Sequence, residues 1–181
     1  MSTKSFIINL PIITGDQDRR RLRKSFSFGC NLQNAVMGGG WDRVLRMRAT
    51  PEWQAARVMP KGSERTKAFR DLRVRFRLSE YDFHADVAMH RKASGRGHLL
   101  GINECQKLAS RAWISVERHL YNGGAPRFIS SRRGLHSIEG KTNRTGIIWK
   151  ADQQCVTVCK SATTGSPELC RIRRIPQSPE R

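Results

Sequence analysis

The sequence SRAWISVERHLYNGGAPRFISSRRGLHSIEGKTNRTGIIWK, residues 110–150, joins the end of an amphipathic helix to a basic turn and then to strand-like sequence. The helix begins upstream, near Leu99, because apolar residues recur there every three or four positions and so fall on one face. They are Ile102, Cys105, Ala109, Ala112, Trp113, Val116 and Leu120. Two glycines and a proline within residues 123–126 end the pattern. We therefore predict a core helix over residues 99–121.

Short apolar stretches separated by Gly and Asn follow this helix, a pattern typical of β-hairpins. They lie at residues 127–129, 134–138 and 145–149. Near the N-terminus, residues 5–13 read SFIINLPII, which is β-branched and apolar. Pro11 cannot donate a ladder hydrogen bond, so this segment indicates an edge strand. The order of strand, helices and strands predicts an α+β chain in which a helical insertion interrupts a β module.

Further helices are expected inside the insertion. Asp16 is a candidate N-cap for a helix that runs to about residue 36, where the glycines at 38–40 should end it. Thr50 and Pro51 mark another helix start, because Thr is a preferred N-cap and Pro is favoured at the first helical position. Residues 63–78 combine an apolar stripe with many arginines, and residues 81–91 form one more candidate helix.

The composition favours a binder of polyanions. The 181 residues carry 34 Lys and Arg against 15 Asp and Glu, which gives a formal charge of +19 and a pI near 11.1. This excess exceeds what a merely well-solvated basic protein needs. No apolar run approaches the roughly 20 residues that span a bilayer, and the N-terminal charges follow the short apolar run, so neither a membrane span nor a secretory signal is expected. Five scattered cysteines favour a reducing cytoplasm.

Two groups of residues resemble metal sites, and both have a simpler interpretation. Asp82, Asp86 and His90 are spaced at four residues along a helix, but no second cluster completes a site, so we favour a solvated helix face. The cysteines at 155, 159 and 170 lack a fourth ligand with the spacing of structural zinc. The cysteines at 30 and 105 lie on apolar stripes and are interpreted as packing residues. No metal and no other cofactor is predicted.

An independent catalytic site is not expected either. Glu104, Glu117 and Glu139 are too isolated from one another for paired acid–base chemistry. The glycines at 38–40 lack the Lys and the Ser or Thr of a phosphate-binding loop. The sequence therefore predicts no catalytic residues.

Cations interleaved with aromatic rings are the strongest functional signal. Lys and Arg meet phosphates, small polar groups meet phosphate or sugar oxygens, and rings stack on exposed bases. The candidate nucleic-acid-binding residues are Arg19, Arg20, Arg23, Lys24, Arg65, Arg70, Arg73, Arg77, Arg127, Phe128, Arg132, Arg133, Lys141 and Arg144. An alternative interpretation places Phe128 and Trp149 in the core with a solvated charged rim. The two interpretations are compatible in part, because ring burial and contact between cations and a nucleic-acid backbone can coexist.

Several short elements of this sequence form a set. They are Phe28-Gly29-Cys30-Asn31 followed by Asn34-Ala35, the helix over residues 112–116, and Pro126-Arg127-Phe128 with Ser131-Arg132-Arg133. Together they resemble the N-terminal half of TnpB proteins, which are the OrfB proteins of insertion sequences and relatives of the type V CRISPR effectors. The resemblance extends over about residues 4–150.

The resemblance implies a partial OB-like wedge β-barrel with an inserted helical recognition bundle. Residues 1–14 would supply the first wedge strand, residues 15–122 the recognition insertion and residues 123–158 the remaining wedge strands. In that family the two parts grip a guide RNA and its heteroduplex with target DNA, while base pairing reads the sequence. The expected partners are guide RNA and DNA, in a bacterial or archaeal cytoplasm and associated with the nucleoid.

The chain also departs from the family pattern. TnpB proteins carry their cutting chemistry after the wedge, in a RuvC-like domain with acidic metal ligands and an inserted zinc ribbon. We therefore expect a truncated, nucleic-acid-binding fragment that does not cut DNA, with residues 159–181 as a disordered and out-of-frame tail. The alternative is a small basic, non-catalytic DNA- or RNA-binding protein with a structural or regulatory role. The sequence indicates no oligomeric state.

Overall fold

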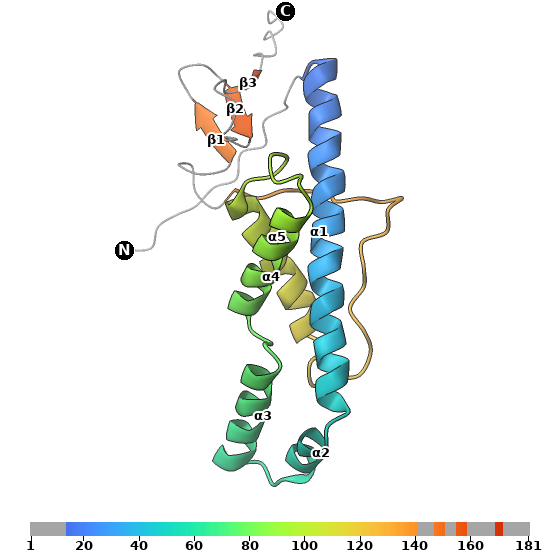
Figure 1. The fold of residues 1–181 in the computed structure, drawn as a ribbon, viewed down its shortest axis with the longest axis vertical. Coiled ribbons are helices and arrows are strands. Elements are labelled where there is room, and N and C mark those ends of the chain that lie inside the picture. Colours follow the sequence, from blue (N-terminus) through green and yellow to red (C-terminus); the bar gives the residue numbers. More distant parts are fainter. Residues whose placement is uncertain (1–13, 141–146, 151–154, 159–168, 172–181) are drawn as a thin grey trace, which may run out of the picture.

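The computed structural model describes residues 14–140, 147–150, 155–158 and 169–171. The helices are α1 (Asp16–Arg48), α2 (Pro51–Val58), α3 (Ser63–Arg75), α4 (Glu80–Ala93) and α5 (Ile102–Glu117). The strands are β1 (Ile147–Lys150), β2 (Cys155–Val158) and β3 (Leu169–Arg171). The long α1 has α4 and α5 beside it, and α2 and α3 lie at the end where α1 finishes (Figure 1). The described chain is therefore mainly helical, with one small sheet.

The core lies where α1, α4 and α5 meet. Its buried apolar residues include Val36, Met37, Val44 and Met47 of α1, Phe83 and Val87 of α4, and Cys105, Leu108, Ala109, Ala112, Trp113 and Val116 of α5. Burial of such stripes is the main driving force for packing helices together. The predicted helix over residues 99–121 is confirmed as α5 but is shorter at both ends. Its predicted stripe is buried except for Ile102, and Leu120 is buried beyond the end of α5. Cys30 and Cys105 are buried, which confirms them as packing residues.

Helix α1 is longer than predicted, because the glycines at 38–40 do not end it. Gly40 lies against the Phe83 ring, and a Cβ at this position would come within 2.1 Å of Phe83 Cζ. The missing side chain therefore allows α1 and α4 to approach closely. The predicted N-cap is also wrong by one residue: Gly15 is the N-cap, and Asp16 lies in the first turn, where a carboxylate interacts favourably with the helix dipole.

Local signals set the starts of α2 and α4. The Thr50 hydroxyl accepts a hydrogen bond from the Trp53 amide, and Pro51 occupies the first helical position, as predicted. At α4, Ser79 and Asp82 form a capping box, in which each side chain accepts a hydrogen bond from the other residue's backbone amide. Each cap satisfies backbone N–H groups that the first turn of a helix leaves unpaired.

Residues 118–140 contain no strand, so the predicted strands at 127–129 and 134–138 are wrong. Side chains of α1 and α5, rather than a β-ladder, bind the backbone here. Asn34 donates to the Ile129 carbonyl (2.8 Å) and accepts from the Ile129 amide (2.9 Å). Arg111 donates to the Ser137 carbonyl (2.8 Å). The segment passes alongside α1 in Figure 1.

The strands form one antiparallel sheet in the order β1-β2-β3. Ile148 pairs with Thr157, and Val156 pairs with Cys170. The predicted strand at 145–149 is confirmed over its second half by β1. The described strands form no barrel, and β3 lies within the segment expected to be a disordered tail. The predicted first wedge strand and the rest of that tail lie outside the described residues.

Candidate nucleic-acid interface

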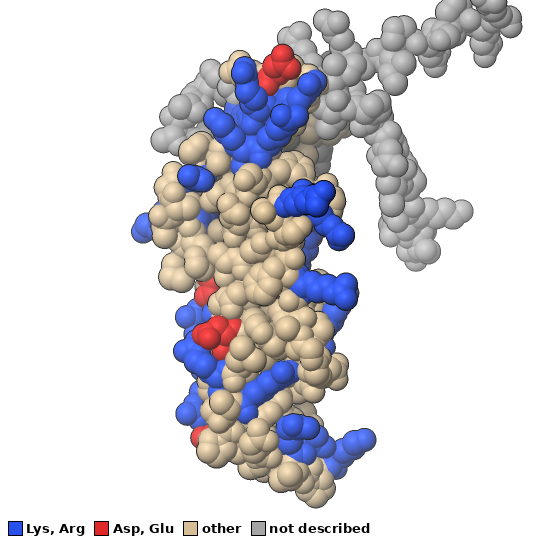
Figure 2. All heavy atoms as spheres, turned by 90° about the vertical axis from the view of Figure 1, so that its right-hand side faces the viewer, with Lys and Arg blue, Asp and Glu red and all other residues tan. Residues whose placement is uncertain are grey.

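The first group of predicted cations lies in the first turns of α1 and comprises Arg19, Arg20, Arg23 and Lys24. All four are exposed, and Figure 2 shows Lys and Arg gathered at the end of the molecule where α1 begins. Asp16 lies 3.7 Å from Arg19, but both side chains are exposed, so water screens the pair. Arg23 and Lys24 also line a hollow of about 530 Å³. This end of α1 therefore presents net positive charge to solvent.

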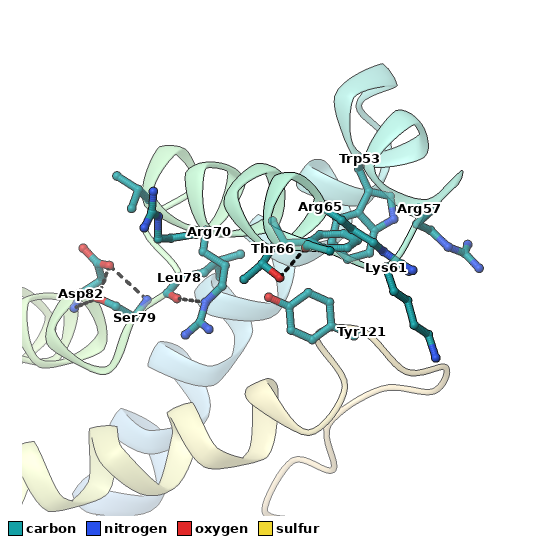
Figure 3. A pocket seen from close by; sticks show the side chains of 14 residues that line it. Trp53, Arg57, Lys61, Arg65, Thr66, Arg70, Leu78, Ser79, Asp82 and Tyr121 are labelled. Atoms are coloured by element: carbon teal, nitrogen blue, oxygen red, sulfur yellow. Dashed lines mark hydrogen bonds between the residues drawn. The ribbon is translucent and has the colours of Figure 1, made fainter. Parts of the chain in front are cut away.

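The second group surrounds a hollow of about 990 Å³, which we call the α2–α3 hollow. It is lined by α2, α3, the start of α4 and the loop after α5. Five cations line it: Arg57, Lys61, Arg65, Arg70 and Arg73. Asp82 is the one carboxylate among its described lining residues. Figure 3 shows residues of α2, α3 and the Tyr121 loop converging on the hollow. The fold therefore brings together Arg65, Arg70 and Arg73, which the sequence predicted as binding residues.

Three aromatic rings belong to the same lining. Trp53 and Tyr121 are stacked, with centroids 5.9 Å apart and planes inclined by 11°. Phe69 meets both edge to face, at 5.1 Å from Trp53 and 5.3 Å from Tyr121. Trp53 is 4% exposed, whereas Tyr121 is 49% exposed. Trp53 therefore anchors the cluster in the core, and Tyr121 presents it to solvent.

Arg48, at the end of α1, holds the loop that carries Tyr121. Its guanidinium donates hydrogen bonds to the carbonyls of His119, Leu120 and Asn122. These carbonyls lie in the turn just beyond the end of α5, and Arg48 supplies them with a charged hydrogen-bond donor. Burial lowers the pKa of the Arg48 guanidinium. The Tyr121 ring is thus fixed by the Arg48 contacts to its loop as well as by its stacking on Trp53.

The charges around the α2–α3 hollow are only weakly neutralised. Arg73 lies 3.6 Å from Glu117, and Arg70 lies 3.6 Å from Asp71. Pairs at such accessible positions contribute little in water, because solvent and salt screen them. Arg65 lies 5.5 Å from the centroid of the Phe69 ring, a cation–π contact that leaves its charge in place. The hollow therefore remains electropositive.

Arg77 was predicted to belong to this group, but it does not line the hollow. Its guanidinium lies 3.5 Å from Asp82 and 3.7 Å from Asp86. Asp86 is itself buried and pairs with Arg43 at 2.6 Å, which links α4 to α1. The prediction of a solvated helix face is therefore wrong for Asp86, because this carboxylate belongs to a buried ion pair.

The third group borders a second hollow, of about 670 Å³, which we call the Phe128 hollow. Arg127, Phe128 and Arg133 line it together with Gln33 of α1. The Phe128 side chain is 50% exposed, so the alternative interpretation that places this ring in the core is wrong. Gln33 is almost fully buried, and its Oε1 has no hydrogen-bond partner. The predicted residues Arg127 and Arg133 thus lie together with the exposed Phe128 ring, and Arg111 of α5 also lines this hollow.

The other predicted residues of the third group do not line the Phe128 hollow or lie outside the described residues. Arg132 is exposed on the same segment but does not line the Phe128 hollow. Lys141 and Arg144 lie outside the described residues. Trp149 is half-buried in β1.

Glu139 gives this segment a pH-dependent contact with α5. Arg111 donates hydrogen bonds to the Glu139 carboxylate, and this lowers the pKa of Glu139 below its ordinary 4.5. A lowered folded-state pKa means that the contact stabilises the fold above the unfolded-state pKa, and that this stability is lost as pH falls through the folded-state value. Because half of the Glu139 side chain is exposed, the contribution stays below about 1 kcal/mol.

We therefore expect Glu139→Gln to lower the free energy of unfolding slightly at pH 7, and the difference from the unmodified chain to vanish as pH falls through the lowered folded-state pKa of Glu139. Urea denaturation of both proteins across this pH range measures it. A difference that stays constant with pH would show that the charge of Glu139 is not responsible.

Four lining residues of the α2–α3 hollow are not among the predicted binding residues. Trp53 and Arg57 belong to α2, Lys61 to the turn before α3, and Tyr121 to the loop after α5. Arg57 and Lys61 flank the turn that ends α2, and this was the available signal for them. The stacking of Trp53 on Tyr121 joins distant segments, and no spacing in the sequence indicates it.

Within the described ranges, no three His, Cys, Asp or Glu residues lie close enough to hold a metal ion. Of the described helices, none combines the length and the apolar character needed to cross a bilayer. No family model, curated protein or solved structure matches the chain.

Proposed function

We propose that this chain binds nucleic acid, as the RNA- and DNA-contacting part of a TnpB-type RNA-guided system in a bacterial or archaeal cytoplasm, close to the nucleoid. In this proposal the helices act as the recognition bundle and β1–β3 belong to the wedge. Guide RNA and DNA are the partners, and contact is mainly to the phosphate backbone. The TnpB assignment rests on the short sequence elements around Phe28, Asn34 and Arg127.

The observation that carries the binding proposal is the α2–α3 hollow, where five cations surround three aromatic rings. Cations bind phosphates, and aromatic faces bind bases, so this combination fits nucleic acid better than it fits other polyanions. The Phe128 hollow repeats the combination with Arg127, Phe128 and Arg133. The net charge of +19 adds a long-range attraction for any nucleic acid.

The proposal assigns no cutting reaction to these 181 residues. Several described carboxylates around the two hollows already have partners: Asp82 caps α4, Glu117 lies beside Arg73, and Glu139 pairs with Arg111. Cleavage of RNA or DNA by the purified chain, dependent on Mg²⁺ or Mn²⁺, would contradict this part of the proposal.

Alanine at Arg127, Arg132 and Arg133 tests the proposed phosphate contacts. Removing one phosphate contact should reduce the slope of log K against log salt concentration by about 0.7–0.9, because fewer counterions are released on binding. Fluorescence anisotropy with a labelled RNA measures this slope. The matched control is alanine at Arg46, Arg75 and Lys92, three exposed cations that line none of the hollows.

If the control triple variant reduces the slope as much as the Arg127, Arg132 and Arg133 variant does, binding is diffuse and the proposed interface is wrong. A second comparison separates a guide-RNA binder from a small basic structural or regulatory protein. A TnpB-type protein should prefer RNA transcribed from the end of its own transposon over random RNA of equal length. Equal affinity for the two RNAs would favour the structural or regulatory role.

A further inference from the structure

We propose that the α2–α3 hollow binds an unpaired nucleotide of a single strand, with its base against the Tyr121 ring and its phosphates on the surrounding cations. This inference deepens the proposed function and rests on it. The net positive charge of the chain alone predicts neither this position nor this ligand.

The size and lining of the hollow fit a nucleotide. Its volume of about 990 Å³ lies at the upper end of the range for small-ligand sites, which leaves room for a base, a sugar and flanking phosphates. Phe69 and the exposed Val74 add apolar surface to the lining. An apolar surface bordered by cations matches a ligand with one flat apolar part and one anionic part.

The Tyr121 ring remains accessible to a ligand. Trp53 stacks on this ring, and Phe69 meets it by an edge-to-face contact. Nevertheless 49% of Tyr121 is exposed, so these two contacts leave about half of the residue open to solvent. A base that stacks there extends the Trp53–Tyr121 stack by one ring. The position of Tyr121 is already fixed by the Arg48 contacts, so little ordering is required on binding.

The positive charge of the lining favours an anionic ligand over a second copy of this chain or an apolar peptide. A second copy of this chain would bring the same cations against the five already present, which is repulsive. An apolar peptide would leave those cations without counter-charge. Among the described lining residues the one carboxylate, Asp82, already accepts hydrogen bonds from the backbone and side chain of Ser79. An anionic ligand with an aromatic face therefore complements the hollow.

A single strand fits better than a duplex, because bases within a duplex are stacked on one another and their faces are not accessible. The Thr66 and Ser79 hydroxyls of the lining are already engaged within the protein. Thr66 donates its hydroxyl to the Gly62 carbonyl, and Ser79 donates its hydroxyl to Asp82, so neither has a proton left to donate to a 2′-hydroxyl. We expect single-stranded RNA and single-stranded DNA to bind the hollow through the same chemistry.

Tyr121→Leu tests the stacking contact in the full chain, since it removes the ring and keeps an apolar side chain. The chain has two tyrosines, and Tyr81→Leu is the matched control, because Tyr81 is 85% exposed on α4 and does not line the hollow. We expect Tyr121→Leu to weaken binding of a single-stranded oligonucleotide by about tenfold or more, the scale of one stacked base. Affinity for a blunt duplex and the salt slope should stay unchanged.

A second variant changes a charge at the hollow and leaves the Trp53–Tyr121 stack intact, so it tests the site without disturbing that packing. Lys61→Glu places a carboxylate at the hollow, and Lys67→Glu makes the same change at another exposed lysine of this region that does not line it. We expect Lys61→Glu to weaken single-strand binding more than Lys67→Glu does. Parallel assays with RNA and DNA strands of one sequence should show equal reductions in affinity; a reduction confined to one of them would overturn the expectation of shared chemistry.

The outcomes separate this inference from the proposed function. If Tyr121→Leu and Lys61→Glu bind single strands as their controls do, while the unmodified chain binds nucleic acid with a steep salt dependence, the nucleotide site is wrong and the proposed function stands. If the unmodified chain binds no nucleic acid at low salt, the proposed function fails and this inference fails with it. Self-association that Tyr121→Leu abolishes, with single-strand affinity unchanged, would assign the hollow to a second copy instead.

Discussion

Replacing Asp86 with alanine is expected to lower the free energy of unfolding by about 3–5 kcal/mol, the scale for removing one partner of a buried ion pair. Asp86 lies 2.6 Å from Arg43, and both side chains are largely shielded from water. The substitution leaves the Arg43 guanidinium buried without a counter-charge, next to the Phe83 ring, and its Nε already lacks a hydrogen-bond partner. Because small domains have stabilities of about 5–15 kcal/mol, such a decrease would leave this one marginal.

Urea denaturation followed by helical circular dichroism measures the effect, and Asp42→Ala is the matched control. Asp42 pairs with Arg46 on the same helix as Arg43, but both side chains are about two-thirds exposed. Such a pair contributes only about 0.3–0.5 kcal/mol. Equal decreases for Asp86→Ala and Asp42→Ala would contradict the assignment of a buried pair that joins α1 to α4.

Adjacent glycines of α1 are expected to respond to alanine with opposite signs. A Cβ at Gly40 would lie 2.1 Å from Phe83 Cζ and 2.7 Å from Phe83 Cε1, so the ring or the helix must move. Overpacking of this kind costs about 1–3 kcal/mol. At Gly39 a Cβ would meet nothing within 4 Å, and alanine there should stabilise the helix by about 0.5–1 kcal/mol.

The two single variants differ by one position and carry the same change, so each is the control for the other. Their urea midpoints, compared with that of the unmodified chain, give the signs directly. A stabilising Gly40→Ala would show that α1 and α4 do not approach as closely as the Gly40–Phe83 contact requires.

The helices could largely be predicted from the sequence, because their signals are local. The three- and four-residue spacing from Cys105 to Val116 marked α5, and Thr50 with Pro51 marked α2. The end of the first helix could not be predicted. Glycines at 38–40 ordinarily indicate a break in a helix. The reason for a glycine at position 40 inside α1 is the Phe83 ring, which packs against it from α4, a helix far away in the sequence.

The prediction of strands at residues 127–129 and 134–138 was wrong for a related reason. Their short apolar stretches are typical of hairpins, but a β-ladder is one of several ways to satisfy a backbone. Asn34 binds both polar groups of Ile129, and Arg111 binds the Ser137 carbonyl. These partners lie far away in the sequence, so neither composition nor alternation reveals them.

The sequence indicated most of the charged residues of the candidate interface, but it did not indicate how the fold arranges them around the aromatic rings. The clustering of arginines on α3 indicated Arg65, Arg70 and Arg73, and the basic turn indicated Arg127 and Arg133. The aromatic contribution of Trp53 and Tyr121 depends on the loop that Arg48 holds against α2 and α3. A contact between segments so far apart requires the tertiary fold.

The most direct test of nucleic-acid binding is the salt dependence of affinity for a single-stranded RNA, measured with the unmodified chain. Neutralisation of several phosphates by the basic groups predicts binding at low salt and a steep linear fall of log K with log salt concentration. A flat dependence, or no binding at low salt, would contradict the proposed function.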